Sequence, residues 1–307
     1  MRTNKDILPF QGLLNGIGQV YFTQSATTSL LLLLSISIES LWLSFMTLIG
    51  AASSHLLACY SHKPSQDIEN GLYALNGALV ALFIGNIFGV TPVLTLLAIV
   101  GALLTVPIAH IVFQFKTYRG YTSAFILVSW LIYSLYTTLN WSSFNAEPSV
   151  PFPLINVNIG DWINLDEWLH IPSILDPLLK GISQVSFIEN ALSGIVILVA
   201  IALNNLKHAL WVVASVVIST NFSNAIGVSD ALVEQGLYGY NAVLVTLALL
   251  LYKGVTWPLI VLGIVASSLI TLGFHELSLL PLTGPFILST WGVVYLSRLM
   301  KRSRVNS

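Results

Sequence analysis

Long apolar runs alternate with short polar breaks along most of the chain. Most runs approach the roughly 20 residues that an α-helix needs to cross a bilayer. The pattern predicts an all-α polytopic membrane protein with ten transmembrane helices, five in each half of the chain. These spans are expected near residues 27–44, 45–60, 71–90, 92–114, 121–139, 191–205, 208–222, 236–252, 255–273 and 285–300.

The two halves repeat one sequence pattern. GIGQVYF from Gly16 recurs as GISQVSF from Gly181, an offset of 165 residues. At the same offset, GLYALNGALVAL from Gly71 recurs as GLYGYNAVLVTL from Gly236. A match kept over this length indicates two homologous units. The predicted organisation is a first transmembrane repeat at 1–139, an extracytoplasmic linker rich in proline at 140–179, and a second, inverted transmembrane repeat at 180–307.

Composition supports a chain that lies almost wholly in lipid. Its 307 residues are 55% hydrophobic and only 8% charged, whereas a soluble domain carries about a quarter charged residues. A large soluble catalytic domain has no room in such a chain. The single cysteine, Cys59, excludes an intramolecular disulfide and a cysteine metal cluster, and the formal charge of −1 gives no support for a nucleic-acid partner. We expect neither a metal nor a cofactor.

The positions of Lys and Arg predict the topology, because these residues accumulate in cytoplasmic loops. With both termini in the cytoplasm, eleven of the 12 basic residues fall on the cytoplasmic side and only Lys180 lies outside. Five spans per half then force the second repeat to enter the membrane upside down. Inverted repeats are characteristic of transport proteins, whose solute site lies near the membrane midplane between the repeats.

Two amphipathic segments precede the first span of each half. Residues 8–24 and 175–189 are too short and polar to cross the bilayer, so we interpret them as half-inserted or broken helices. Irregular backbone at membrane depth is tolerated only where it is buried in protein or lines a watery cavity. Gln19 and Gln184 are therefore candidate pore-lining groups, with bridging of helix ends as the alternative.

Other polar side chains form repeat pairs within the predicted spans. Asn76 and Asn241 either bond the backbone of an interrupted helix or contact the solute. Thr122 and Thr283 offer hydroxyl groups near the start of the last span of each half. The histidines near span ends are interpreted as interfacial residues without repeat partners.

Nine of the ten expected spans contain no Lys or Arg, and the tenth has only Arg298, near its predicted cytoplasmic end. Ion channels and proton-coupled transporters normally place charged groups there, so the pattern favours a small, neutral, polar solute. Nucleophile, P-loop and dinucleotide motifs are missing, which argues against an enzyme.

The sequence resembles the urea transporter family over nearly its whole length. The resemblance rests on GIGQVYF at Gly16, on GLYALNGAL at Gly71 with GLYGYNAVL at Gly236, and on LTGPF from Leu282, which is similar to the family signature LPxxTxPF. It implies a homotrimer, surrounded by membrane lipid, in which each protomer passes urea down its gradient through its own channel-like pore. The short loops indicate a multi-pass protein of the plasma membrane, which in bacteria is the inner membrane. The alternative is a coupled secondary transporter, or a channel for another small neutral polar solute such as a substituted urea or a short amide.

In that family, apolar slots strip water from the faces of urea while a ladder of oxygens accepts its N–H groups. Leu75 departs from the aromatic wall that is common in the family, and Phe187 enters only as the repeat equivalent of Phe22. The pore residues that the resemblance implies are Gln19, Phe22, Leu75, Leu79 and Thr122 in the first repeat and Gln184, Val185, Phe187, Tyr240, Leu244 and Thr283 in the second.

Overall fold

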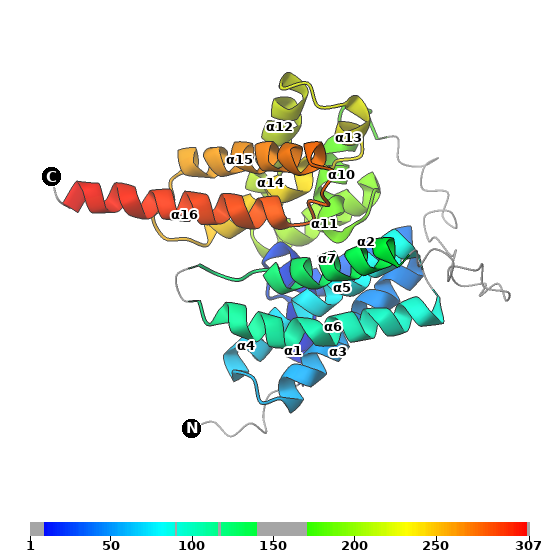
Figure 1. Cartoon of the computed structure of the whole chain (residues 1–307). Helices are drawn as coiled ribbons and strands as arrows, with labels where there is room; N and C mark the ends of the chain where they lie inside the picture. The colour runs from blue at the N-terminus through cyan, green and yellow to red at the C-terminus, as the bar shows by residue number, and fades with distance from the viewer. Residues whose placement is uncertain (1–8, 90, 116–117, 140–170, 306–307) are drawn as a thin grey trace. The chain divides into compact units, whose positions relative to one another are not determined.

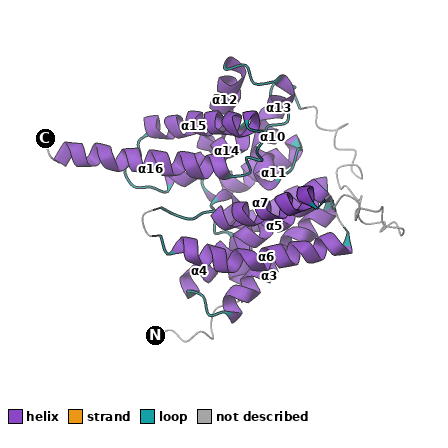
Figure 2. Cartoon of the chain, viewed as in Figure 1, coloured by secondary structure: helices purple, strands orange, loops and turns teal. Residues whose placement is uncertain are grey.

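The computed structural model describes residues 9–89, 91–115, 118–139 and 171–305. Within these ranges the secondary structure is helical and contains no β-strand (Figures 1 and 2). The chain divides into two compact units, Met1–His170 and Ile171–Ser307.

The first unit is built around α5, which is apolar on every side and buried over nearly its whole length. A helix of that kind is stable only when other helices enclose it, and α5 packs mainly against α3 and α6. The elements of this unit are α1 (Pro9–Gly18), η1 (Gln19–Tyr21), α2 (Ala26–Glu39), α3 (Leu41–Tyr60), α4 (Ser65–Glu69), α5 (Leu72–Phe88), α6 (Pro92–Phe113) and α7 (Ser123–Thr138).

The second unit repeats this arrangement around α14, which is also buried along most of its length. It packs mainly against α12, α15 and α16. The elements are α10 (Asp176–Ser183), η3 (Gln184–Ser186), α11 (Ala191–Asn204), α12 (Leu206–Ala225), α13 (Asp230–Glu234), α14 (Gly239–Leu250), α15 (Trp257–Glu276) and α16 (Gly284–Val305).

Each of the ten predicted ranges coincides mainly with one helix, although several boundaries differ. The first helix ends at Glu39 rather than near residue 44, because the Ser40 hydroxyl accepts a hydrogen bond from Leu43 N at 3.3 Å and caps α3. Asn205 caps α12 in the same way, through His208 N at 3.2 Å. Residues 140–170 of the predicted linker lie outside the described residues, and α10 begins at Asp176, inside the predicted linker range.

Length and composition identify a smaller number of candidate membrane spans among the described residues. Three helices, α3, α6 and α15, are long and apolar enough to cross a bilayer. Two helix pairs pass the same test together but are bent, by 66° between α1–η1 and α2 and by 72° between α10–η3 and α11. Counting each bent pair as one span gives up to five.

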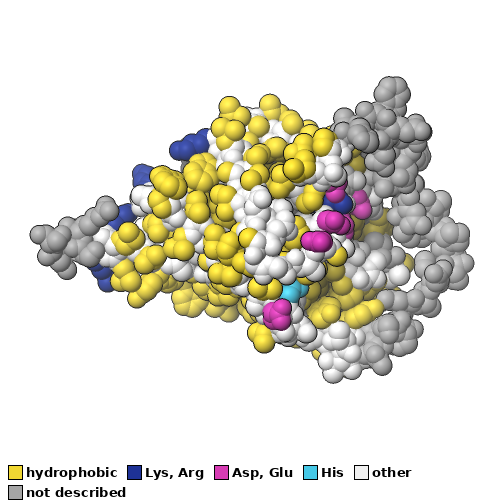
Figure 3. Space-filling view, turned by 90° about the horizontal axis from the view of Figure 1, so that it is seen from above, with side chains coloured by type: hydrophobic (Ala, Val, Ile, Leu, Met, Phe, Trp, Pro, Cys, Tyr) yellow, Lys and Arg dark blue, Asp and Glu magenta, His cyan; other side chains and the backbone are white. Residues whose placement is uncertain are grey.

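The described surface fits a lipid environment. Figure 3 shows apolar side chains spread widely over the face in view, where charged side chains are few. On α6, for example, Val93, Leu96, Leu104 and Ile111 are all exposed. An apolar stripe of that length is avoided in water, so it is suited to acyl chains.

Two glycines allow the short first helix of each unit, α1 or α10, to pack closely against the rest of that unit. Gly71 and Gly236 both have φ of +75°, in the left-handed region. A Cβ atom on Gly71 would overlap the backbone of Gly16, and one on Gly236 would overlap the backbone of Gly181. Only glycine satisfies both the dihedral angle and the close contact.

We therefore predict that Gly71→Ala and Gly236→Ala each lower the free energy of unfolding by about 3 kcal/mol or more, through the left-handed strain and the overlap. Thermal unfolding in detergent, followed by size-exclusion chromatography, measures the effect. Gly273→Ala on α15 is the matched control, since nothing lies within 4 Å of its added Cβ. Equal stability of all three variants would contradict the structural role of Gly71 and Gly236.

Candidate functional site

In the first unit, α1 and η1 form one short helical segment that ends in a sharp bend at Phe22. The backbone of Phe22 is left-handed, with φ of 58°, and Phe22 N donates to Gln19 O at 3.0 Å. Thr23 N and its hydroxyl both bond Gly18 O, at 3.1 and 2.9 Å. Ser25 then caps α2 by accepting from Thr28 N at 3.4 Å. The backbone N–H groups of Phe22, Thr23 and Thr28 thus bond within the unit, as backbone at membrane depth requires.

The second unit builds the same bend from different residues. Phe187 has φ of 59°, and its N–H donates to Gln184 O at 3.0 Å. The Ser183 hydroxyl donates to Ile188 O at 2.8 Å, and Asn190 caps α11 through Ser193 N at 3.0 Å.

A phenylalanine in the left-handed region stores roughly 1–2 kcal/mol of strain. Because strain of this kind persists only where the surroundings impose it, its occurrence at both Phe22 and Phe187 marks the two bends as candidate sites.

The glutamine at each bend is held in one orientation. Gln19 Nε2 donates to Asn70 O at 3.1 Å, and Gln184 Nε2 donates to Gln235 O at 3.0 Å. A main-chain carbonyl can only accept, so it must face the NH₂ end of the side chain. The carbonyl oxygen of each glutamine then points away from that main-chain carbonyl, and none of the described hydrogen bonds uses it. Both readings of these residues, bridging and lining, are therefore compatible.

Asn76 and Asn241 bond the irregular start of α7 and of α16. Asn76 Oδ1 accepts from Phe125 N at 2.9 Å, while its Nδ2 donates to Tyr121 O at 3.3 Å. Asn241 Oδ1 accepts from Phe286 N at 3.1 Å, and its Nδ2 donates to Leu282 O at 3.2 Å. Of the two alternatives for this pair, bonding of the helix backbone is confirmed.

These asparagine bonds place the two candidate threonines. Thr122 and Thr283 directly follow Tyr121 and Leu282, whose backbones are both left-handed with φ of 45°. Both threonines are buried. The described contacts thus link Thr122 to the Asn76 segment of α5, and Thr283 to the Asn241 segment of α14.

Aromatic side chains lie beside the same segments. Phe22 contacts Tyr121 edge-on, with ring centroids 5.7 Å apart. In the second unit the hydroxyl of Tyr240 donates to Leu282 O at 2.8 Å, a bond that Leu75 at the equivalent position cannot make. Leu79 and Leu244 lie about one helical turn beyond these positions and are buried, as is Val185.

Within each unit, the predicted residues therefore belong to three contacting segments. They are the bend, the first turns of the central helix and the start of the last helix. The parts of the candidate site that the sequence reasoning missed are backbone acceptors, namely the carbonyls of Asn70, Gln235, Tyr121 and Leu282. For Tyr121 and Leu282, the repeated asparagines Asn76 and Asn241 were the sequence signal that pointed to a bonded backbone.

The expectation that no histidine has a repeat partner was wrong for one pair. His110 and His275 are separated by the repeat offset of 165 residues, as are Tyr73 and Tyr238. Tyr73 Oη lies 3.4 Å from His110 Nδ1, and the rings of Tyr238 and His275 stack with centroids 5.8 Å apart. Tyr73 and Tyr238 each belong to a buried apolar cluster, so the hydrogen bond of the first pair and the ring contact of the second both join the histidine to the packing of its own unit.

Ionisable groups near the candidate site are few. Lys180 pairs with Asp176 (Nζ–Oδ2 2.8 Å) and Glu189 (Nζ–Oε1 3.9 Å) across the second bend. Burial raises the pKa of the Asp67 carboxyl on α4, and nearby His110 partly offsets that rise. Among the described residues, no three His, Cys, Asp or Glu side chains are grouped so that they could hold a metal ion.

Comparison with known proteins extends the resemblance of the motifs to the whole chain. The family profile described as Urea transporter matches residues 10–170 and 175–306. "Urea transporter 1" of Mus musculus is 32% identical over 106 residues, which cover 33% of this chain and 28% of that protein. "Urea transporter 1" of Ovis aries is 35% identical over 98 residues, or 31% of this chain and 26% of that protein. The chain thus matches little more than a quarter of the length of these relatives. Because the profile covers nearly all of both repeats, the chain belongs to the urea transporter family.

Proposed function

We propose that this multi-pass membrane protein transports urea passively, through a channel-like pore in each protomer of a homotrimer. In this proposal each repeat contributes five spans, and the second repeat is inverted relative to the first. Both termini lie in the cytoplasm, and the membrane is the plasma membrane, which in bacteria is the inner membrane. The family supports a transport protein rather than an enzyme.

The orientation of the two glutamine side chains carries the proposal. Gln19 and Gln184 direct their NH₂ groups to main-chain carbonyls of their own units, and each therefore presents an oxygen. Urea has four N–H donors and a single acceptor. A pore mouth that offers acceptors replaces the water that urea loses from its N–H groups on entry, which an apolar mouth could not do.

Apolar side chains would complete the pathway. In the proposed pore Phe22, Leu75 and Leu79 form the slot of the first repeat. Val185, Phe187, Tyr240 and Leu244 form the slot of the second. Flat apolar walls remove water from the two faces of urea, while oxygens at the edge bond its hydrogens. Thr122 and Thr283 would supply such oxygens at the narrow middle, held there by the anchored starts of α7 and α16.

Flux measurements in proteoliposomes test the proposed function against coupled transport. We expect stopped-flow light scattering to show rapid urea entry that does not depend on a proton or sodium gradient. N,N′-dimethylurea and glycerol should enter more slowly, because each offers fewer N–H donors. Dependence on either gradient would refute passive urea transport, and so would the absence of urea flux from proteoliposomes that contain the folded protein.

We further predict that Thr283→Val slows urea flux about tenfold while the trimer still assembles. Loss of one buried acceptor costs roughly 1–3 kcal/mol, and 1.4 kcal/mol in a barrier is a factor of about ten in rate. Thr290→Val on the same helix is the matched control, because the Thr290 hydroxyl is buried without a described partner. Wild-type flux through Thr283→Val would remove that residue from the pathway.

The inverted topology predicts that equivalent ends of α6 and α15 face opposite sides. In a Cys59→Ala background, we expect Gln114→Cys, just after α6, to react with an impermeant thiol reagent only from the cytoplasm. Glu276→Cys, at the end of α15, should react only from outside. Both residues are exposed, so access in the folded protein does not limit the reaction. Labelling of both from one side would refute the inverted repeat.

A further inference from the structure

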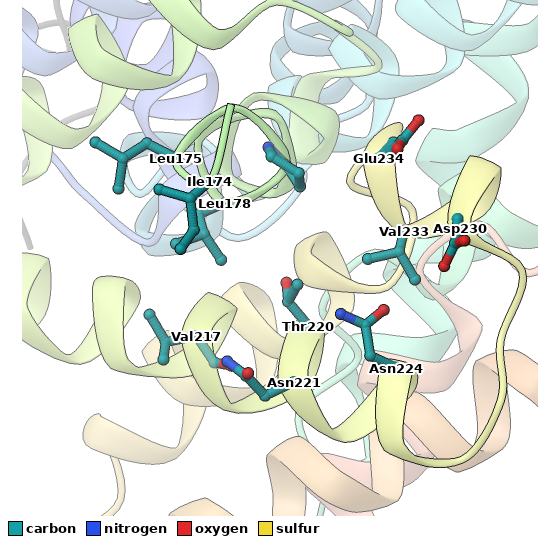
Figure 4. A pocket seen from close by; sticks show the side chains of 11 residues that line it. Ile174, Leu175, Leu178, Val217, Thr220, Asn221, Asn224, Asp230, Val233 and Glu234 are labelled. Carbon is teal, nitrogen blue, oxygen red and sulfur yellow. The ribbon is translucent and has the colours of Figure 1, made fainter. Parts of the chain in front are cut away.

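The second unit contains a groove that the proposed pathway does not use. It has a volume of about 540 Å³ and lies between α10, α12 and α13 (Figure 4). Volumes of a few hundred Å³ are typical of small-ligand sites. Leu175 and Leu178 line it from the α10 side. Leu175 and Leu178 share one face of this helical segment, since they are three residues apart. Lys180 and Gln184, four residues apart, share a different face of it.

The first repeat fills the equivalent place. His55 stands at the position of Thr220 and is buried. Its ring lies so close to Gly12 that an added Cβ there would come within 2.7 Å of His55 Cε1. The second repeat has Pro177 in place of Gly12 and the smaller threonine in place of the histidine. The groove therefore follows from substitutions specific to the second repeat.

One end of the groove continues as an apolar stripe. Leu206, Leu210, Val213 and Val217 are exposed on α12 at spacings of three or four residues, which place them on one face. At 1.5 Å per residue the stripe is roughly 16 Å long. Val217 also lines the groove. A stripe of this kind on a membrane protein is suited to an acyl chain.

The other end of the groove is polar. Asn221 and Asn224 continue the exposed face of α12, and Asn221 Nδ2 donates to Val217 O at 2.8 Å, which leaves its oxygen toward other partners. Asp230 and Glu234 lie four residues apart on α13 and therefore on one side of it. Among the described residues neither carboxylate has a basic group within ion-pair distance, since the described ion pairs are those of Lys180.

We infer that this groove binds an aminophospholipid. The acyl chain lies along the α12 stripe, Thr220 and Asn224 donate to the phosphate, and the ammonium group bonds Asp230 and Glu234. The chemistry of the lining selects this occupant: carboxylates attract the ammonium, while an anionic head without an amine is repelled. The inference depends on the membrane location of the chain and not on the solute that it carries.

Native mass spectrometry of the full chain in mild detergent tests the inference. The protein is incubated with equal amounts of phosphatidylethanolamine, phosphatidylcholine and phosphatidylglycerol that have identical acyl chains. We expect roughly fivefold more phosphatidylethanolamine than phosphatidylglycerol to remain bound, an effect in the range of one partly exposed ion pair. Phosphatidylcholine should fall between them, because its ammonium has no N–H donor. Equal retention of the three lipids would overturn the proposal.

Variants locate the binding in this groove. Asp230→Asn combined with Glu234→Gln should abolish the preference for phosphatidylethanolamine. Glu69→Gln, at the first-repeat position equivalent to Glu234, should keep it. An equal loss in both would overturn the assignment to the second repeat.

Val217→Glu should weaken binding of all three lipids, since it places a charge on the path of the acyl chain.

Free ethanolamine is the matched soluble probe. If it binds as well as the lipid, the groove is a site for a soluble amine and the lipid proposal fails. A change of oligomeric state in Asp230→Asn/Glu234→Gln, with lipid retention unchanged, would instead identify a contact between copies of the chain and would also refute it.

Discussion

The fold depends on one requirement, that backbone N–H and C=O groups within a bilayer bond inside the protein. A helix broken at membrane depth violates this requirement unless other groups replace the lost bonds. At the first bend, Thr23 and Ser25 do so for the backbone. At the second bend Ser183 and Asn190 have these roles. The irregular backbone on which the candidate site is built is therefore stable because short polar side chains complete it.

The same requirement explains the position of the asparagine pair. The start of an α-helix leaves its first N–H groups without partners, and α7 and α16 begin beside the buried central helices. Asn76 and Asn241 bond one N–H and one carbonyl at these starts. An amide is suited to this position because it donates and accepts without carrying a charge into an apolar interior.

The sequence predicted the helices well because apolar run length is a direct measure of burial in lipid. The sequence also drew attention to Gln19, Gln184 and the asparagine pair, since polar residues repeated at one offset within apolar runs need an explanation. The break at Ser40 was predicted several residues too late, between residues 44 and 45, because the apolar pattern continues across Ser40 and only the cap ends the helix. The left-handed Phe22 and Phe187 could not be predicted, because tertiary contacts rather than local preference impose that conformation.

The most informative difference between the repeats lies in the residues whose main-chain carbonyls accept the glutamine and asparagine hydrogen bonds. Gln19 bonds the main chain of Asn70, whereas Gln184 bonds the main chain of Gln235. Tyr121 and Leu282 likewise differ in side chain but offer the same carbonyl.

A bond to the main chain does not depend on which side chain the acceptor carries. The acceptor positions could therefore change during divergence of the two repeats while the glutamine and asparagine donors stayed fixed. Positions outside this set diverged further: the ion-paired Asp176, Lys180 and Glu189 stand where the first repeat has the neutral Gln11, Asn15 and Gln24. The backbone geometry of the two bends is therefore shared between the repeats, while the charge of the residues around them has diverged.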